Sequence, residues 1–568
     1  MDKKVTILTL LVVALITNVA FAGTTGKIKG KVTDPEGLAL IGVNVLLVDT
    51  DKGAVTNLDG FYDIVNIDPG TYTLLFKYVG YADKRITNVK VMVDKTTQIN
   101  VEMEEASIQG EEVTVVAQRP IVEIDKTTTS ATVDGETINS LPIVNVSEAI
   151  DLQAGVNDGH FRGGRIGEVS YMVNGVPINN ALTNEAAFQV EPNMISSLEV
   201  ISGVFNAEYG QALSGVVNVV TKGVQDEWTG NISSQVGMLA SPRDFTFVKR
   251  TAPRGDNLGI EDFESQEYNF FDMGDIRNLT DIRGSISGPI IPGKLGLNLT
   301  GRFFQEKGSL FARNLFLPSD SSANVNQTSN TDLWRIESNG DQEFDARNGG
   351  RRYSINAGLN YEFSGRTKLE YNLFLVDGQS TFYDHFTRYV PEGRNTNFGF
   401  TQNHIMSLKQ TFGDNTFTNL SYQYQSDKNE SYLFESPFDD RHLPPEFGAT
   451  AGSNGFSMGG NDLGQSKELT QTHTVIGSIT SQINRSNQIK AGFEAHRFTL
   501  DNYNFAIEVN SNTNFEPQPT TDPFRQDSLF VQPVQYAAYI QDKLELNNLI
   551  INMGLRFDYF NAKYDVPV

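Results

Sequence analysis

Residues 353–375 read YSINAGLNYEFSGRTKLEYNLFL, and apolar side chains take alternate positions on both sides of a short turn. From Tyr353 to Phe363 the odd positions are Tyr, Ile, Ala, Leu, Tyr and Phe, whereas the even positions are Ser, Asn, Gly, Asn and Glu. After the turn at 364–366 the apolar face continues to Leu375. A period of two is typical of β-strands with one apolar and one polar face, so this stretch predicts two consecutive strands.

Similar alternation recurs within residues 226–568, but a soluble sandwich also alternates, and the connections decide between the two. Strands of 9–11 residues cross an outer membrane, with short turns on the periplasmic side and long loops outside. Residues 226–568 are therefore predicted to form a transmembrane antiparallel β-barrel wall. Short turns fall near 289–294, 364–366, 413–415, 484–487 and 547–548, and long polar stretches near 240–278, 306–351, 379–401, 429–469 and 503–533.

The predicted wall has about eleven strands, the first near Trp228–Leu239 and the last at Leu549–Phe560. Bacterial single-chain barrels have even strand numbers, and an unclosed wall would leave backbone groups unpaired in lipid. About eleven strands close to a diameter of roughly 22 Å and twenty-two to roughly 44 Å, whereas a ~110-residue domain is roughly 34 Å across. Only the wider ring holds the domain that precedes the wall. We therefore expect the first half of a twenty-two-stranded barrel.

Residues 120–225 carry a dense series of short motifs. The sequence reads LPIVNVSEAIDLQAGV at 141–156, VNGVP at 173–177 and EPNMISSLEVISGVFNAEYGQALSGVVNVVTKG at 191–223. Over essentially its whole length the segment resembles the TonB-dependent receptor plug domain. The resemblance implies a small α/β domain inside the barrel. Where that family commonly has Arg-Gly-Pro, this chain has Ser-Gly-Val at 202–204, so no role for that arginine is carried over.

Two charged residues of the plug-like segment, Arg162 and Glu199, are candidate contacts with the barrel. A charge buried inside a barrel needs an opposite charge or hydrogen bonds. Both residues could therefore hold the plug against charged groups on the barrel lumen. Ordinary surface ion pairing is the alternative interpretation.

Residues 104–119 form a linker that begins acidic and then has a β-branched run, Glu112-Val113-Thr114-Val115-Val116-Ala117. An isolated strand can add to the edge of a partner's sheet, with main-chain hydrogen bonds giving the affinity. Alternatively, the run is the first strand of the next domain. The plug resemblance favours strand addition, because the family keeps its TonB box at this place. The TonB energy-transducing complex is then the expected partner.

Residues 23–103 have period-two runs such as 41–45 and 72–76, separated by turn signals such as Asp-Pro-Glu-Gly at 34–37. Short strands at this spacing predict a β-sandwich. The segment resembles the carboxypeptidase-regulatory-like domain, which is non-catalytic in its family. This domain is shared by SusC-like and Oar-like receptors. The linker lacks the SusC-like sequence after the box, so the resemblance is Oar-like.

The remaining features bear on compartment and chemistry. Residues 1–22 are predicted to be a signal peptide, with Lys3 and Lys4 before an apolar run and Ala-Phe-Ala at 20–22. A net charge of −24 argues against nucleic acid. Without cysteine, disulfides are excluded. The histidines form no His-Glu-x-x-His motif and no Gly-x-Ser-x-Gly elbow occurs, so we expect no enzyme, no metal site and no cofactor.

The expected function follows from the plug resemblance. It implies a receptor in the cell outer membrane of a Gram-negative bacterium, in contact with outer-membrane lipids, with its N-terminal domain in the periplasm. The receptor would import a scarce ligand (a siderophore, cobalamin, a glycan or a peptide) with proton-motive energy delivered through TonB. Ligand-binding residues are not identified by sequence. A passive outer-membrane adhesin or structural barrel is the alternative, although neither explains a plug with an exposed N-terminal strand.

Overall fold

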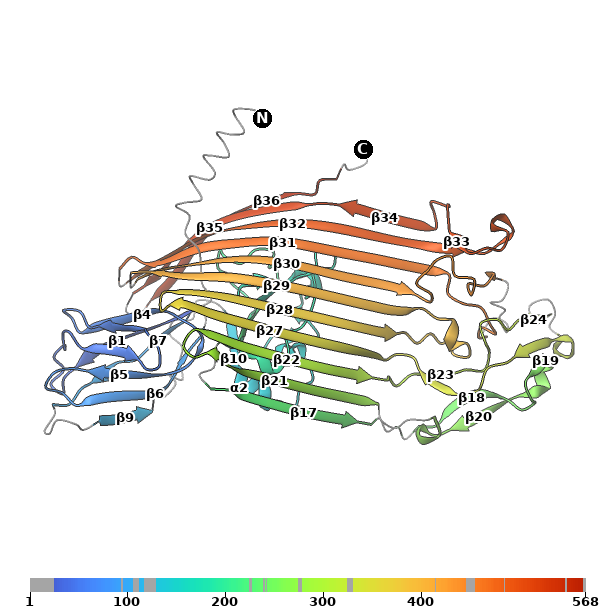
Figure 1. Ribbon diagram of the computed structural model, residues 1–568, viewed down its shortest axis with the longest axis horizontal. Helices are drawn as coiled ribbons and strands as arrows, with labels where there is room; N and C mark the ends of the chain where they lie inside the picture. The colour runs from blue at the N-terminus through green and yellow to red at the C-terminus, as the bar shows by residue number, and fades with distance from the viewer. Residues whose placement is uncertain are drawn as a thin grey trace, which may run out of the picture.

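The computed structural model describes residues 25–92, 95–105, 112–116, 129–223, 227–238, 241, 243–273, 278–323, 330–413, 415–445, 455–484, 486–546 and 549–564. The expected signal peptide at 1–22 and most of the expected linker lie outside these residues. The expected mainly β fold is confirmed, as a sandwich, a small α/β domain and a large open sheet (Figure 1). Among the described residues, no helix has the length and hydropathy needed to cross a membrane.

The N-terminal domain is a sandwich of two sheets, as its alternating strands predict. Alternate side chains such as Ile28, Val45 and Leu74 are fully buried between the sheets. Gly37 ends its predicted turn with a φ of +83°, a conformation that glycine adopts freely. The first sheet contains β1 (Gly26–Thr33), β4 (Phe61–Ile67), β7 (Thr96–Gln98) and β8 (Val101–Glu102). The second has the order β3-β2-β5-β6-β9, from β2 (Asn44–Leu47), β3 (Gly53–Val55), β5 (Gly70–Lys77), β6 (Asp83–Val91) and β9 (Glu112–Val116).

The second domain is a five-stranded sheet with two short helices, α2 (Gly135–Ser140) and α3 (Val146–Asp151). In α3 the Glu148 carboxylate accepts a hydrogen bond from the backbone N–H of Asn145, which caps the helix. Leu152 follows the last residue of this helix and is 64% exposed. The strands are β10 (Ser130–Asp134), β15 (Ile195–Ile201), β16 (Gly215–Thr221), β13 (Val169–Val173) and β14 (Val176–Pro177), in that order; a hairpin of β11 (Val156–Asn157) and β12 (His160–Phe161) stands apart.

The wall is a sheet of eleven consecutive antiparallel strands, and short turns alternate with long connections as the sequence predicts. Inner and outer faces also alternate as predicted, since Leu359 is 37% exposed and its neighbour Asn360 is 6% exposed. The sheet is not closed. Its strands are β17 (Thr229–Gly237), β21 (Leu279–Ile291), β22 (Leu295–Glu306), β27 (Gly350–Ser364), β28 (Thr367–Thr381), β29 (Thr396–Phe412), β30 (Thr416–Tyr432), β31 (Gly464–Gln482), β32 (Asn487–Glu508), β35 (Val534–Glu545) and β36 (Ile550–Asn561).

The long connections contain structure that their polar sequences do not predict. A hydrophobic cluster buries Phe247, Phe316 and Tyr389, which come from different connections. The N-terminal domain lies at the opposite end of the wall, beside the short turns (Figure 1). The added strands are β18 (Phe245–Arg250), β19 (Gly255–Leu258), β20 (Phe263–Tyr268), β23 (Phe311–Arg313), β24 (Ser322–Ala323), β25 (Arg335–Ser338), β26 (Phe344–Ala346), β33 (Gln518–Pro519) and β34 (Gln526–Val531).

Candidate functional site

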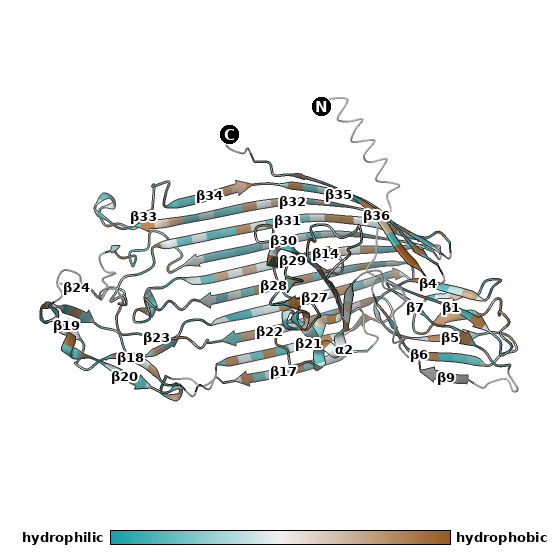
Figure 2. Cartoon of the chain, turned by 180° about the vertical axis from the view of Figure 1, so that it is seen from behind, coloured by the Kyte–Doolittle hydropathy of each residue, from teal (hydrophilic) through white to brown (hydrophobic). Residues whose placement is uncertain are grey.

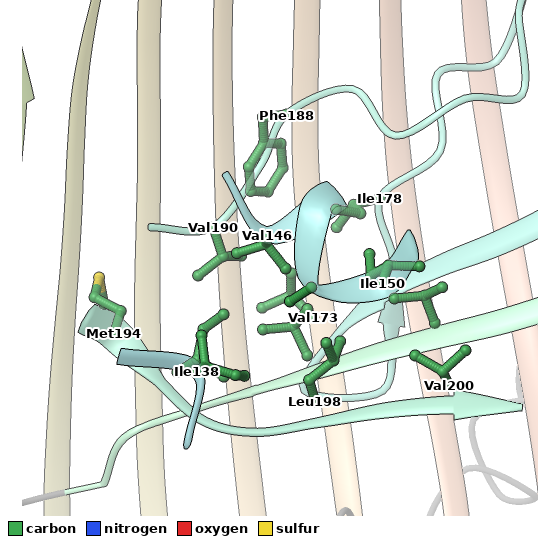
Figure 3. Close-up of a cluster of buried hydrophobic side chains, with 14 of the residues drawn as sticks. Ile138, Val146, Ile150, Val173, Ile178, Phe188, Val190, Met194, Leu198 and Val200 are labelled. Atoms are coloured by element: carbon green, nitrogen blue, oxygen red, sulfur yellow. The ribbon is translucent and has the colours of Figure 1, made fainter. Parts of the chain in front are cut away.

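The α/β domain lies against one face of the wall, as the view from behind shows (Figure 2). Its core gathers Ile138 of α2, Val146 and Ile150 of α3, and Leu198 of the sheet (Figure 3). The same cluster continues into the wall, because Phe188 stacks on Phe374 of β28 with ring centroids 4.8 Å apart. Apolar packing thus joins the domain to the inner face of the wall.

A buried ion cluster joins the α/β domain to the wall at Glu191. The Arg302 guanidinium of β22 donates to the Glu191 carboxylate at 3.1 Å and to both carboxylate oxygens of Asp281 at 2.8 Å. All three residues are at most 4% exposed. A two-pronged guanidinium–carboxylate pair fixes both distance and orientation. Glu191 precedes the short 3-10 helix Pro192–Met194, which leads directly into β15, so the cluster holds the central sheet in place.

Two further wall arginines hold the start of α3. Arg352 of β27 donates to the side-chain oxygen of Asn145 at 3.1 Å. Arg283 of β21 donates to the backbone oxygen of Val144 at 2.9 Å. Because both acceptors are neutral, these contacts orient the helix without adding a buried charge to it.

A second ion cluster lies farther along the wall, at Glu208. The Lys490 ammonium of β32 pairs with the Glu208 carboxylate, which also accepts from the Gln541 amide at 3.1 Å. Arg556 of β36 donates to the backbone oxygen of Glu208 at 2.9 Å. The Arg556 guanidinium also lies against Gly210, where a Cβ atom would fall 2.2 Å from its nitrogen. A glycine at this position therefore lets the arginine approach the backbone.

The structure describes the positions of both charges chosen from the sequence, Arg162 and Glu199. Arg162 is exposed, has a φ of +48° and lies against Gly203 of its own domain. Glu199 is 6% exposed in the middle of β15 and lines a polar cavity that also contains Glu208 and Lys490. Glu191 and Glu208, which the sequence did not single out, make charged contacts with the wall. Both lie in the motif-rich stretch 191–223, but nothing in the sequence distinguishes a glutamate facing the wall from one within the sheet.

The candidate TonB box corresponds to strand β9, except for Ala117, which lies outside the described residues. β9 pairs with β6 of the N-terminal domain in parallel, with Glu112 opposite Asp83 and Val116 opposite Thr87. It is the last strand in the order of that sheet. One edge of strand β9 is therefore paired with β6. Among the described residues, the other edge of β9 is the end of the sheet.

Comparison with protein families follows the same division of the chain. Residues 28–115 match the CarboxypepD_reg-like domain, and residues 123–217 match the TonB-dependent Receptor Plug Domain. Over the second of these segments the chain is therefore similar to TonB-dependent receptors. This second match covers most of the α/β domain that Glu191 and Glu208 join to the wall.

Curated relatives carry names of the same kind. The chain is 24% identical over 262 residues to the TonB-dependent transporter Oar of Myxococcus xanthus, covering 43% of this chain and 23% of Oar. It is 30% identical over 206 residues to the TonB-dependent receptor P26 of Formosa agariphila, covering 33% of this chain and 20% of P26. The chain spans about a fifth of the length of these relatives. The expected Oar-like resemblance is confirmed, and these relatives carry names of transporters and receptors rather than enzymes.

Two solved structures align with this chain over about three quarters of its length. The ferric citrate transporter FecA aligns at a TM-score of 0.49 and 11% identity, covering 77% of this chain and 57% of that one. The siderophore receptor PirA of Pseudomonas aeruginosa aligns at 0.45 and 16% identity, covering 77% and 56%. Within the described part of this receptor, no group of three or more His, Cys, Asp or Glu side chains could hold a metal ion.

Proposed function

We propose that this chain acts in energised import across a bacterial outer membrane, as a plug and a wall that open when TonB pulls. The observation that carries the proposal is the plug-matching domain, which is ion-paired through Glu191 to the inner face of a membrane-type sheet. Such a plug closes the pore at rest and is removable on demand. The ligand is a small molecule of the siderophore, cobalamin, glycan or peptide classes. Extracellular loops and the plug surface would bind it.

The energy-coupling partner would be the TonB complex, acting on residues 112–117. A β-branched strand at the end of a sheet can pair with a partner strand through its main chain. Glu191 and Glu208 would then be the charged contacts that must break or slide when the plug moves. Glu199 would line the polar cavity between the plug and the N-terminal domain. Arg162 would stabilise the loop of the plug that contains Gly203.

A catalytic role is not part of this proposal. The sequence has no recognised nucleophile or metal motif. A passive adhesin remains the competing function, and transport assays separate the two.

Selective depletion of one compound class from the medium is the expected result for an importer. Cells would be incubated with ferric siderophores, cobalamin, oligosaccharides and short peptides, and the medium would be followed by mass spectrometry. The parent strain should remove one class that a strain lacking this gene leaves behind. Parent cells treated with a protonophore should also fail, because import needs the proton gradient. Equal depletion by parent and deletion strains would favour the adhesin.

The location proposed for the chain is the outer membrane, with the N-terminal domain in the periplasm. The long connections then face the outside and the short turns face the periplasm. This orientation is consistent with the N-terminal domain lying beside the short turns (Figure 1).

Thiol labelling of intact cells tests this orientation, and the chain's lack of cysteine makes single-cysteine variants unambiguous. Phe524→Cys lies in a long connection at a side chain that is 96% exposed. Lys294→Cys lies in an exposed short turn. A membrane-impermeant maleimide should label Phe524→Cys on whole cells and Lys294→Cys only after the outer membrane is opened. The reverse pattern would invert the topology.

A further inference from the structure

The N-terminal domain is attached to the wall by its own set of ion pairs, separate from those that hold the plug. Asp68, in the turn after β4, lies between two lysines of the wall, with its carboxylate 2.9 Å from the Lys368 ammonium and 3.2 Å from the Lys409 ammonium. Glu370 pairs with the same two lysines at 3.1 and 2.9 Å. The lysines are 15% and 11% exposed. These four residues therefore form a largely buried ion cluster between the N-terminal domain and the wall, rather than an isolated exposed ion pair.

The charge balance of this cluster depends on the N-terminal domain. Burial by itself would raise the pKa of Asp68, but Lys368 and Lys409 hold this pKa well below its usual range. Asp68 is thus an anion at neutral pH. Asp68 therefore gives the two wall lysines a carboxylate partner from the docked domain, in addition to Glu370 of the wall itself.

Contacts on other strands of the wall make the attachment broad. Lys29 of β1 pairs with Glu545 of β35, whose other oxygen accepts from the Thr96 hydroxyl at 3.1 Å. The Lys27 ammonium donates to the Gln482 side chain of β31 at 3.1 Å. The Asn66 amide donates to the Thr411 hydroxyl of β29 at 2.7 Å. With Lys368 on β28, the domain contacts the short-turn ends of four wall strands.

The cavity behind this interface is too small for most ligands. It has a volume of about 80 Å³ and is lined by all three parts of the chain, including Lys27, Glu199 and Lys490. Small-molecule sites usually occupy about 300–1,000 Å³. A ligand that passes the plug on this side meets the docked domain next.

The candidate TonB strand belongs to the same domain. β9 continues its second sheet beyond β6, and the sheet order ends at β9. A partner strand added to β9 would extend this sheet through main-chain hydrogen bonds. A pull on the added strand would therefore reach the N-terminal domain through the β6–β9 pair. It would also reach the plug, which follows β9 in the chain.

We propose that residues 25–105 form a second gate, docked on the periplasmic rim of the wall by Asp68 and Lys29, which must leave the rim before a ligand can pass. The inference rests on the proposed transport function. The interface is polar, with hydrogen bonds and ion pairs that water can replace when the surfaces part. Such contacts suit a domain that docks and undocks repeatedly, whereas a permanent interface buries a more apolar surface.

A reversible crosslink between the domain and the rim tests the gate. A Cβ atom placed on Gly365 would lie 2.7 Å from the Cβ of Asp51, and both residues are in exposed turns. A disulfide has a Cβ–Cβ distance of about 3.8 Å, so Asp51→Cys with Gly365→Cys requires the turns to part by roughly 1 Å.

Uptake would be measured in cells as depletion of the mixture of siderophores, cobalamin, oligosaccharides and peptides described above. The oxidised double variant should lose depletion, and a reducing agent should restore it. The Asp51→Cys and Gly365→Cys single variants should each match the parent under both conditions. Mass spectrometry of the linked peptides would establish that the crosslink has formed. Normal depletion by a fully crosslinked receptor would overturn the gate, whereas a parent strain that depletes nothing would instead contradict the transport function.

Discussion

Proline at Val115 is expected to reduce uptake to the level of a strain without this gene, while ligand binding at the cell surface stays normal. Val115 is the fourth residue of β9 and is paired with Ile86 of β6. Proline lacks the backbone N–H and disrupts strand pairing at this position. A TonB strand that adds to residues 112–116 would lose main-chain bonds, which supply the affinity of this recognition mode.

The matched control is Val115→Thr, which keeps the backbone donor and a β-branched side chain. It should take up ligand at nearly the parental rate. Binding of the purified periplasmic domain of TonB to the receptor in lipid nanodiscs gives a second readout, lost in Val115→Pro and kept in Val115→Thr. Parental uptake by the proline variant would remove residues 112–117 from the energy-coupling role.

The second large effect is expected at Arg302, whose removal should loosen the plug from the wall. Arg302→Ala leaves the buried Glu191 carboxylate without its guanidinium partner. Breaking a buried ion pair from one side costs about 3–5 kcal/mol. We expect the lower end, about 3 kcal/mol, because Arg283 still donates to Asp281 at 2.6 Å. Hydrogen exchange of β15 in the lipid-embedded receptor should then accelerate by roughly a hundredfold.

Two variants show whether the effect comes from the buried pair. Arg302→Ala combined with Glu191→Gln removes the orphaned charge and should recover part of the lost protection. Arg441→Ala breaks a loop pair with Asp439 in which the arginine is 69% exposed, and it should leave β15 unchanged. Equal exchange in Arg302→Ala and Arg441→Ala would mean that the Glu191 cluster does not hold the plug.

The long connections show one limit of sequence reasoning. Their apolar residues, such as Phe247, Phe316 and Tyr389, occur singly in polar stretches without a period of two or 3.6. Periodicity detects an apolar face only within one strand or helix. The cluster that these residues form joins segments more than sixty positions apart, and only tertiary contacts bring them together.

The charged contacts show the same limit. Glu191, Glu199 and Glu208 all lie in one recognisable stretch, and the sequence favoured Glu199 together with Arg162. The structure places Glu199 within its own domain's sheet, and Glu191 and Glu208 opposite Arg302 and Lys490. Which side chain meets an opposite charge depends on how the domain is rotated inside the wall.

The sequence by itself predicted the wall and the sandwich from local patterns, and the plug from its resemblance to a family. Alternation with a period of two fixes which face of a strand is apolar, and turn residues fix where each strand ends. Only the tertiary structure decided that β9 pairs with β6 and that Asp68 docks between Lys368 and Lys409. The Asp68 contacts join residues far apart in the chain through single ion pairs. Such contacts leave no periodic trace, since one charged residue at a turn looks the same in sequence whether it faces water or a partner.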